Sequence, residues 1–332
     1  MHQPSAISHQ PSAISHQPSA ISHGLNRPPV LPYDEASRVM KSALDNGANF
    51  WSAAQYYGTP TANSLHLLNH YFTTYPEDSE RVILSIKGAF SREGPDNRPE
   101  SIRNSVDTCL KVLDGKAFLD IYSPARIDPQ VPIEETVSAL VEYIKAGKIG
   151  GYGLSECSAA TIRRAHSVHP VSAVEIELSL FATDILSNGV AQTCSELKIP
   201  LIAYSPLSRG FLTGQLKKLD DIPEGDSRRL FPRFQPEVFD LNIKLVKEIE
   251  QLAKKTGYTM PQVAIAWVTS QATKWNIPVI PVPGCTTVAR AEENFAQVSL
   301  KEQDLDELSQ MVAKMTVIGN RYPEMHQKYV NQ

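Results

Sequence analysis

The sequence predicts an α/β protein built as a (β/α)₈ barrel, the TIM-barrel architecture, whose first strand is weak or missing. Short runs rich in Val, Ile and Leu alternate with amphipathic stretches from residue 32 onward, and the connections between them are short. This alternation predicts a parallel sheet with crossover helices. No GxGxxG motif follows the first clear strand, so a doubly wound open sheet is the weaker alternative.

The chain is long enough for one such barrel. It has 332 residues, of which 42% are hydrophobic and 20% are charged, and its net charge is −4. A barrel of this class uses about 250 residues or more. The charge balance excludes a generically basic nucleic-acid binder, and no apolar run approaches the roughly 18–20 residues that a membrane span needs.

Two further features indicate the compartment. The first residues lack the basic segment and apolar stretch of a secretory signal. The four cysteines lie far apart without a CxxC pair, so neither a disulfide framework nor a metal site is expected. We therefore expect a cytoplasmic protein with reduced thiols.

The N-terminal segment has an unusual composition. The heptapeptide His-Gln-Pro-Ser-Ala-Ile-Ser occurs three times in succession from His2, and a fourth copy begins at His23. Each copy carries a proline, which costs about 3 kcal/mol inside a helix, and offers only Ala and Ile as apolar residues. We predict a disordered tail at 1–23, the barrel at 24–318 and a C-terminal tail at 319–332.

Seven strands and their helices account for the barrel. Strands buried on both faces read as continuous apolar runs, and Pro99 and Ser158 are typical of a helix start. The predicted strands are 49–53, 81–88, 118–123, 149–154, 173–178, 200–204 and 278–282, and the predicted helices are 34–46, 63–73, 99–113, 133–146, 158–169, 185–197, 238–256, 261–270, 288–295 and 299–315.

Seven strands are one fewer than a closed barrel of this class requires. The missing strand would precede the helix at 34–46. Only residues 21–25 offer a strand there, and their pattern is weak. The heptapeptide segment occupies the expected position of this first strand.

Polar and aromatic side chains gather at the strand ends, where barrels of this class carry their functional residues. The strand ends read FWSAAQYYG at 50–58, SIKG at 85–88, YSPAR at 122–126, GLSE at 153–156, EIE at 175–177, AYSPLSRG at 203–210 and PVPGC at 281–285.

In their order and spacing these motifs resemble the aldo-keto reductase superfamily over about residues 32–318. They are most similar to its fungal pyridoxal reductases, as Asn-Phe-Trp at 49–51, Gly-Leu-Ser-Glu at 153–156 and Gly-Cys-Thr-Thr-Val-Ala-Arg at 284–290 indicate. The pair Ala125-Arg126 also matches that branch, where most of the superfamily has His-Arg. The resemblance implies reduction of a carbonyl compound with a nicotinamide cofactor.

The resemblance implies that Tyr57 is the general acid. A phenol, with an ordinary pKa of about 10, is a poor acid at neutral pH, and Lys87 matches the lysine whose ammonium stabilises the phenolate. The aspartate that usually pairs with this lysine corresponds to Ser52, where the pyridoxal reductases tend to have Asn. The usual histidine corresponds to Ala125, which removes a hydrogen-bond donor and widens the pocket beside the tyrosine.

The nicotinamide end of the implied cofactor site is nearly complete. Tyr204 matches the aromatic residue that stacks on the nicotinamide, and Ser155 and Glu175 match the positions that hold its carboxamide. Glu156 is a further residue of the implied cofactor site. The two glutamates replace the commoner amides. An ionised Glu175 can accept a hydrogen bond from the carboxamide NH₂ but cannot donate one to its oxygen.

The rest of the cofactor site follows from the same resemblance. Arg290 can pair with a 2′-phosphate in a charge-assisted bond, so the resemblance favours NADPH, and a surface ion pair is the alternative for this arginine. The implied pyrophosphate turn consists of Ser205, Leu207, Arg209 and Gly210, and the implied adenosine end consists of Cys285, Thr286, Arg290, Glu293 and Asn294.

Two segments fall outside the repeating pattern. The loop 208–240 is long for a connection inside a domain, and such loops are usually functional. By resemblance it folds over the cofactor, and a tolerated insertion is the alternative. The tail 319–332 carries Tyr322 and Tyr329, and it either lines the substrate mouth or is a loose terminus.

The resemblance therefore implies an NADPH-dependent reduction of an aldehyde, pyridoxal to pyridoxine, with Tyr57 as general acid. The partner is a small-molecule carbonyl compound, with no metal, nucleic acid or membrane. Two alternatives stay open. One is a reductase of another aryl aldehyde or ketone. The other is a cofactor-binding protein with little or no turnover, which the changes at Ser52 and Ala125 favour.

Overall fold

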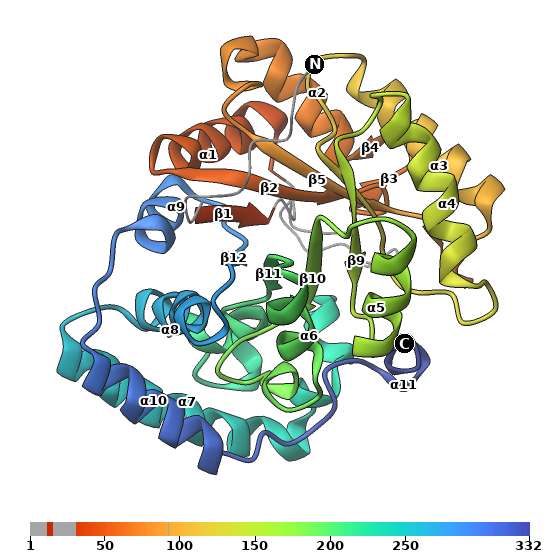
Figure 1. The fold of residues 1–332 in the computed structure, drawn as a ribbon. Helices are drawn as coiled ribbons and strands as arrows, with labels where there is room; N and C mark the ends of the chain where they lie inside the picture. Colours follow the sequence, from red (N-terminus) through yellow and green to blue (C-terminus); the bar gives the residue numbers. More distant parts are fainter. Residues whose placement is uncertain (1–11, 16–30, 92) are drawn as a thin grey trace.

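The structure, a computed structural model, describes residues 12–15, 31–91 and 93–332. Its centre is a sheet of eight strands in the order β1-β2-β5-β8-β9-β10-β11-β12, all paired in parallel. Helices surround this sheet (Figure 1). β1 also lies beside β12, which brings the two edges of the sheet together. The prediction of a (β/α)₈ barrel with a weak first strand is confirmed.

The strands of the barrel agree with the predicted ones to within a few residues. They are β1 (Ser12–Ser15), β2 (Ala48–Ala54), β5 (Ile83–Gly88), β8 (Ile121–Pro124), β9 (Gly151–Ser155), β10 (Ala173–Glu177), β11 (Leu201–Tyr204) and β12 (Val279–Val282). Two short hairpins, β3 (Gly58–Thr59) with β4 (Ala62–Asn63) and β6 (Phe90–Ser91) with β7 (Gly94–Pro95), follow β2 and β5.

The first strand differs from the expectation for the N-terminal segment. β1 lies in the second heptapeptide copy, within the segment expected to be disordered, and pairs with β2 in a register that shifts between Ser12 and Ala13. A sheet edge is paired through main-chain N–H and C=O groups, which need no particular side chain. The strand expected at 21–25 and the rest of 1–23 lie outside the described residues.

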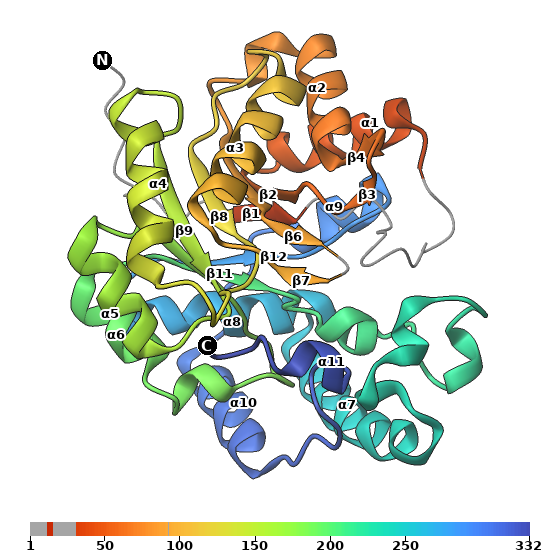
Figure 2. The ribbon, with the colours of Figure 1, turned by 90° about the vertical axis from the view of Figure 1, so that its right-hand side faces the viewer.

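The helices pack against the outside of the barrel (Figures 1 and 2). They are α1 (Tyr33–Asp45), α2 (Ser64–Thr74), α3 (Pro99–Leu113), α4 (Ile133–Lys145), α5 (Ala159–Val168), α6 (Val190–Leu197), α7 (Pro236–Thr256), α8 (Met260–Trp275), α9 (Val288–Phe295), α10 (Glu302–Lys314) and α11 (Glu324–Gln327). The start of α5 is capped as predicted, because the Ser158 side chain accepts a hydrogen bond from the Thr161 N–H. Within the described part of the chain, no helix is long and apolar enough to cross a membrane.

The interior of the barrel has an apolar layer and a charged layer. Phe50, Ile121, Ala173, Ile202, Ile280 and Val282 form a separate buried apolar cluster from five strands. Side chains two residues apart on a strand share a face, so Ser52 follows Phe50 and Glu175 follows Ala173 on the inner face. The polar side chains therefore lie nearer the C-terminal ends of the strands, where the site is.

The loop expected at 208–240 is not structureless. It contains four short 3₁₀ helices, η3 (Ser208–Thr213), η4 (Leu219–Asp221), η5 (Ser227–Leu230) and η6 (Pro232–Phe234), and α7 begins inside it. The side chains of Phe211, Phe234 and Phe239 pack together, with ring centroids 4.4 Å apart for Phe211 and Phe234. The loop is thus fixed to the barrel by its own apolar residues.

Candidate active site

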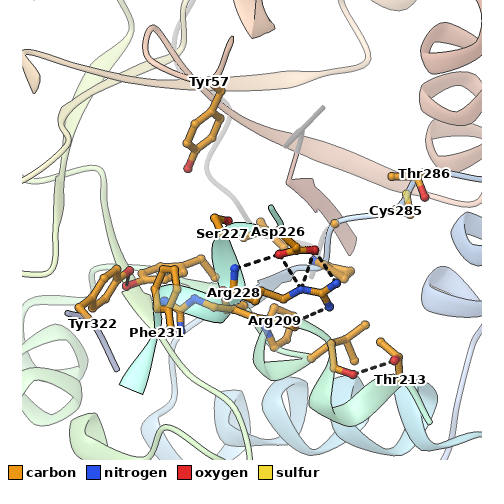
Figure 3. A pocket seen from close by; sticks show the side chains of 18 of the residues that line it. Tyr57, Arg209, Thr213, Asp226, Ser227, Arg228, Phe231, Cys285, Thr286 and Tyr322 are labelled. Carbon is orange, nitrogen blue, oxygen red and sulfur yellow. Dashed lines mark hydrogen bonds and ion pairs between the residues drawn. The ribbon is translucent and has the colours of Figure 1, made fainter. Parts of the chain in front are cut away.

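A cavity of about 560 Å³ opens at the C-terminal ends of the strands. Figure 3 shows Tyr57 pointing into it, with Tyr322 and the pair Cys285 and Thr286 at opposite ends. Most of the predicted site residues line it: Tyr57, Lys87, Ala125, Ser155, Glu175, Tyr204, Ser205, Leu207, Arg209, Gly210, Cys285, Thr286 and Arg290. The structure does not bring Ser52, Glu156, Glu293 or Asn294 to the lining.

Tyr57 is held by the turn that joins β2 to the first hairpin. Its backbone N–H donates to the Ala54 carbonyl at 3.2 Å, and its carbonyl accepts from the Ser64 N–H at 2.8 Å. The next residue, Gly58, has φ +122°, and a Cβ there would lie 2.3 Å from the Ala62 carbonyl oxygen. Only glycine fits this turn, so the sequence Tyr-Gly fixes the direction of the tyrosine.

The ammonium group of Lys87 lies beside Tyr57. Its Nζ lies 5.6 Å from the centroid of the Tyr57 ring, and only 3% of its side chain is exposed. Nζ donates to both carboxylate oxygens of Glu175, at 2.7 and 2.9 Å, and to the Ser52 hydroxyl at 2.6 Å. The predicted neighbourhood of Tyr57 and Lys87 is present, and the anion beside the lysine comes from β10.

The wall next to Tyr57 is formed by Ala125 and Arg126. The small Ala125 side chain is buried and leaves space where the resemblance implied a histidine. The Arg126 guanidinium donates to the Ala125 carbonyl at 2.6 Å and to the Tyr322 hydroxyl at 3.1 Å. Among residues 12–15, 31–91 and 93–332, no carboxylate lies within 4 Å of the Arg126 guanidinium. This cation therefore lines the cavity without an acidic partner at that distance among the described residues.

Glu156 serves the C-terminal tail instead of the cavity. Its carboxylate accepts from the Arg321 guanidinium at 3.0 Å through both oxygens, from the Tyr204 hydroxyl at 2.7 Å and from the Glu177 N–H at 2.8 Å. Burial raises the pKa of Glu156, but the charge and hydrogen bonds of Arg321 outweigh this and hold that pKa below its ordinary value. The carboxylate of Glu156, a predicted cofactor-binding residue, is therefore already engaged in hydrogen bonds within the protein.

The tail 319–332 is anchored at several points. The Gln332 carbonyl accepts from the Ser158 N–H at 2.7 Å, at the start of α5. Tyr322 shares a hydrogen bond of 2.7 Å with the Tyr204 hydroxyl. Tyr322, His326 and Tyr329 line the cavity, which favours the tail as part of the substrate mouth over a loose terminus.

The turn after β11 carries the residues predicted to wrap a pyrophosphate. Ser205, Arg209 and Gly210 have φ values of 52°, 55° and 109°, a left-handed backbone that is costly for residues other than glycine and that often occurs at functional sites. The Arg209 guanidinium donates to the Glu177 carboxylate at 2.8 and 3.1 Å and lies 4.8 Å from the Phe231 ring centroid.

Arg290 lies at the far end of the cavity, beside Cys285 and Thr286. Its guanidinium donates to the Gln215 side-chain oxygen at 2.6 Å and to the Thr286 hydroxyl at 3.2 Å. No carboxylate of the described residues lies within 4 Å of it, which argues against a surface ion pair. An exposed cation with only neutral partners is suited to an anionic ligand.

Several lining residues were not predicted. Asp226, Arg228 and Phe231 come from the long loop, and Asp226 pairs with Arg228 at 2.7 Å. Arg321 was missed because nothing in the tail's pattern marks it. The signal was indirect: two glutamates at neighbouring strand ends, Glu156 and Glu177, need a cation once they are buried.

The fold and the geometry of the cavity define the class of the protein. The aldo/keto reductase family model matches residues 20–313, and the chain belongs to this family of oxidoreductases. The match begins after the end of β1. A solved structure, the glycerol dehydrogenase of Gluconobacter oxydans, has the same fold with a TM-score of 0.76 over 91% of each chain, at 24% identity.

Two curated relatives, both from Schizosaccharomyces pombe (strain 972 / ATCC 24843), are more similar in sequence. The probable pyridoxal reductase 2 is 42% identical over 308 residues, which cover 89% of this chain and 91% of that protein. The aldo-keto reductase yakc, whose name specifies NADP(+), is 38% identical over 87% of this chain and 86% of its own length.

Proposed function

We propose that the protein reduces an aldehyde with NADPH, converting pyridoxal to pyridoxine, and thereby acts in vitamin B6 metabolism. The observation that carries this proposal is one continuous cavity that joins Tyr57 and Lys87 to Arg290. The similarity to a probable pyridoxal reductase supports the substrate, and the similarity to a relative named for NADP(+) supports the cofactor.

The residues present fit a nicotinamide dinucleotide. Arg290, without a carboxylate partner among the described residues, would take the 2′-phosphate. The turn Ser205 to Gly210 would hold the pyrophosphate, and the Tyr204 ring and Ser155 hydroxyl would face the nicotinamide. When bound, the reduced nicotinamide would supply the hydride to the aldehyde carbon.

The protein's own residues would supply the proton for the reduction. Tyr57 would donate its phenolic proton to the carbonyl oxygen, and the Lys87 ammonium would stabilise the phenolate left behind. Solvent would then return a proton to the phenolate. Lys87 is buried, so its field acts on Tyr57 with less screening than it would in water.

The wall around Tyr57 suits an aromatic aldehyde. Tyr56, Phe90 and Tyr329 line the same part of the cavity, and the Tyr56 and Phe90 ring centroids lie 5.5 Å apart. Aromatic side chains present flat apolar faces to a ring, and Ala125 leaves room beside them. The same wall would accept other aryl aldehydes, which a substrate panel distinguishes from pyridoxal.

The proposal is tested by the oxidation of NADPH at 340 nm with pyridoxal, in the wild type and in Tyr57→Phe. The variant keeps the ring and removes the hydroxyl that would donate the proton, so kcat should fall by about 10²–10⁴-fold. Binding of NADPH, followed by fluorescence quenching, should stay within a few-fold. If the folded wild type binds NADPH and none of the carbonyl compounds tested leads to its oxidation, the proposal is contradicted. This result would favour a non-catalytic binding protein.

A further inference from the structure

We propose that the carboxylate of Glu175 positions the ammonium group of Lys87. Ser52 and Glu175 act together in this, because the serine joins the ammonium to a carboxylate that reaches it from the other side of the barrel. The inference rests on the proposed function and deepens it. Three buried side chains meet at one point: Lys87 on β5, Ser52 on β2 and Glu175 on β10. The further consequence is that the negative charge required at Lys87 is supplied by a strand that is not its neighbour in the sheet.

The contacts between the three groups are mutual. Lys87 Nζ donates to both oxygens of Glu175 and to the Ser52 Oγ, and the Ser52 hydroxyl in turn donates to Glu175 Oε2 at 3.1 Å. The serine hydroxyl therefore accepts from the ammonium and donates to the carboxylate. This closed set of hydrogen bonds fixes the position of Nζ better than a single ion pair would.

The ammonium needs this carboxylate. An ammonium removed from water costs several kcal/mol unless a counter-charge and hydrogen bonds replace its hydration. Among the described residues, Glu175 provides the ion pair that Lys87 makes. Ser52 alone would be a neutral partner, and a neutral hydroxyl compensates a buried charge poorly.

The side-chain lengths explain how the charge crosses the barrel. In the sheet order, β5 is the neighbour of β2, whereas β8 and β9 separate β5 from β10. A glutamate at 175 has the reach to approach Lys87 from the opposite wall. The short side chain of Ser52 leaves the space that the Glu175 carboxylate enters.

Two departures from the family pattern therefore meet at one atom. Taken separately, the loss of a carboxylate at Ser52 favours a protein without turnover, and the glutamate at 175 is a poor carboxamide ligand. At Lys87 Nζ they compensate each other, because one position gives up a carboxylate and the other provides one. The main role of Glu175 is therefore to position Lys87 for proton transfer by Tyr57, and not to bind the carboxamide.

The decisive experiment moves the carboxylate from position 175 to position 52. Glu175→Gln should lower kcat/KM for the carbonyl substrate by about 10- to 100-fold, which lies within the range of couplings between contacting groups. Ser52→Asp combined with Glu175→Gln should return kcat/KM to within a few-fold of the wild type. A carboxylate placed on β2 would then do what Glu175 does from β10.

The pH profile separates positioning from simple packing. Removing a negative charge beside Tyr57 and Lys87 makes loss of a proton from this pair easier, so the high-pH decline of kcat/KM should move down by about one pH unit in Glu175→Gln. The double variant should move it back. The other titratable groups near Lys87 are Tyr57 and Tyr56, and the charge of Arg126 acts on Tyr56 together with that of Lys87. None of these groups changes in the variants.

Glu177→Gln is the matched control, because Glu177 lies on the same strand and is equally buried but pairs with Arg209 and Arg321. Ser52→Asp should not rescue this variant. Urea unfolding of all variants gives a readout that does not need turnover: Ser52→Asp should restore the midpoint of Glu175→Gln and not that of Glu177→Gln.

The outcomes are distinguishable. If Glu175→Gln keeps the wild-type kcat/KM and pH profile, or if Ser52→Asp rescues neither its activity nor its unfolding midpoint, the inference is wrong. If the wild type reduces no carbonyl compound, the proposed function fails. The unfolding midpoints then decide alone whether Glu175 is the partner that Ser52→Asp can replace.

Discussion

Two glutamates on β10 lie two residues apart, face the same side of the strand and serve different parts of the molecule. Glu175 holds Lys87, which lies on the opposite wall of the barrel beside Tyr57. Glu177 holds Arg209 and Arg321, which belong to the loop after β11 and to the C-terminal tail. The residue type and burial are the same, so the position of the cation decides the consequence.

The comparison teaches that a buried ion pair is not one kind of interaction. Lys87 lies on a strand whose backbone is fixed by both neighbours, so its pair adjusts the field at Tyr57. Arg321 lies on the C-terminal tail, outside the sheet, so its pairs with Glu156 and Glu177 help to hold the tail over the cavity. Breaking the first should reduce chemistry, and breaking the second should loosen the structure.

The largest effect is expected on the tail side. Arg321→Met leaves Glu156 and Glu177 buried without this cation, and loss of one partner of a buried pair costs about 3–5 kcal/mol. Urea unfolding followed by circular dichroism should show this loss. The fraction that stays folded should keep a kcat within about tenfold of the wild type, because Tyr57 and Lys87 are untouched.

Arg98→Met is the control for this prediction. Arg98 forms an exposed pair with Asp96, and exposed pairs contribute little, so its unfolding midpoint should match the wild type. A folded Arg321→Met protein with full stability but no turnover would break the comparison, because it would place Arg321 with the chemistry.

Arg290, which has no carboxylate partner within 4 Å among the described residues, gives the next effect. Arg290→Ala should weaken NADPH binding by about 10- to 100-fold, since a charge-assisted bond to a phosphate contributes about 1.5–3 kcal/mol. NADH, which lacks the 2′-phosphate, should bind with unchanged affinity. Equal losses for both cofactors, measured by fluorescence titration, would argue that Arg290 acts through the local fold.

The smallest effect concerns pH and the tail. Burial, and then the charges of Arg126 and Lys328, lower the pKa of His326 from its ordinary value of 6.5. The folded protein thus binds this proton less readily than the unfolded chain does. The stability from neutral His326 is present above pH 6.5 and is lost as the pH falls through its folded pKa.

His326→Gln should remove this pH dependence. The free energy of unfolding of the variant should rise slightly relative to that of the wild type as the pH falls from 8 to 5, and the effect should be small because the ring is only partly buried. A pH-independent difference between the two proteins would argue against protonation of His326 as the cause.

The periodic elements could be predicted because their causes are local. The helix at 99–113 agrees with α3 at both ends, since Pro99 starts it and its apolar spacing is helical. The strand ends, and with them Tyr57, Lys87 and Tyr204, follow from the order of strands. The first strand was different: Ser12–Ser15 has no strand signal of its own, and the open edge beside β2 supplies the reason for its pairing.

The sequence by itself determined the family, the barrel and many of the residues around the cavity, because order and spacing along the chain place strand ends together. Only the tertiary structure decided which charges meet. Glu175 lies 88 residues from Lys87 and Arg321 lies 165 from Glu156. An ion pair depends on a few ångströms between side chains from distant segments, and closure of the barrel and docking of the tail set those distances.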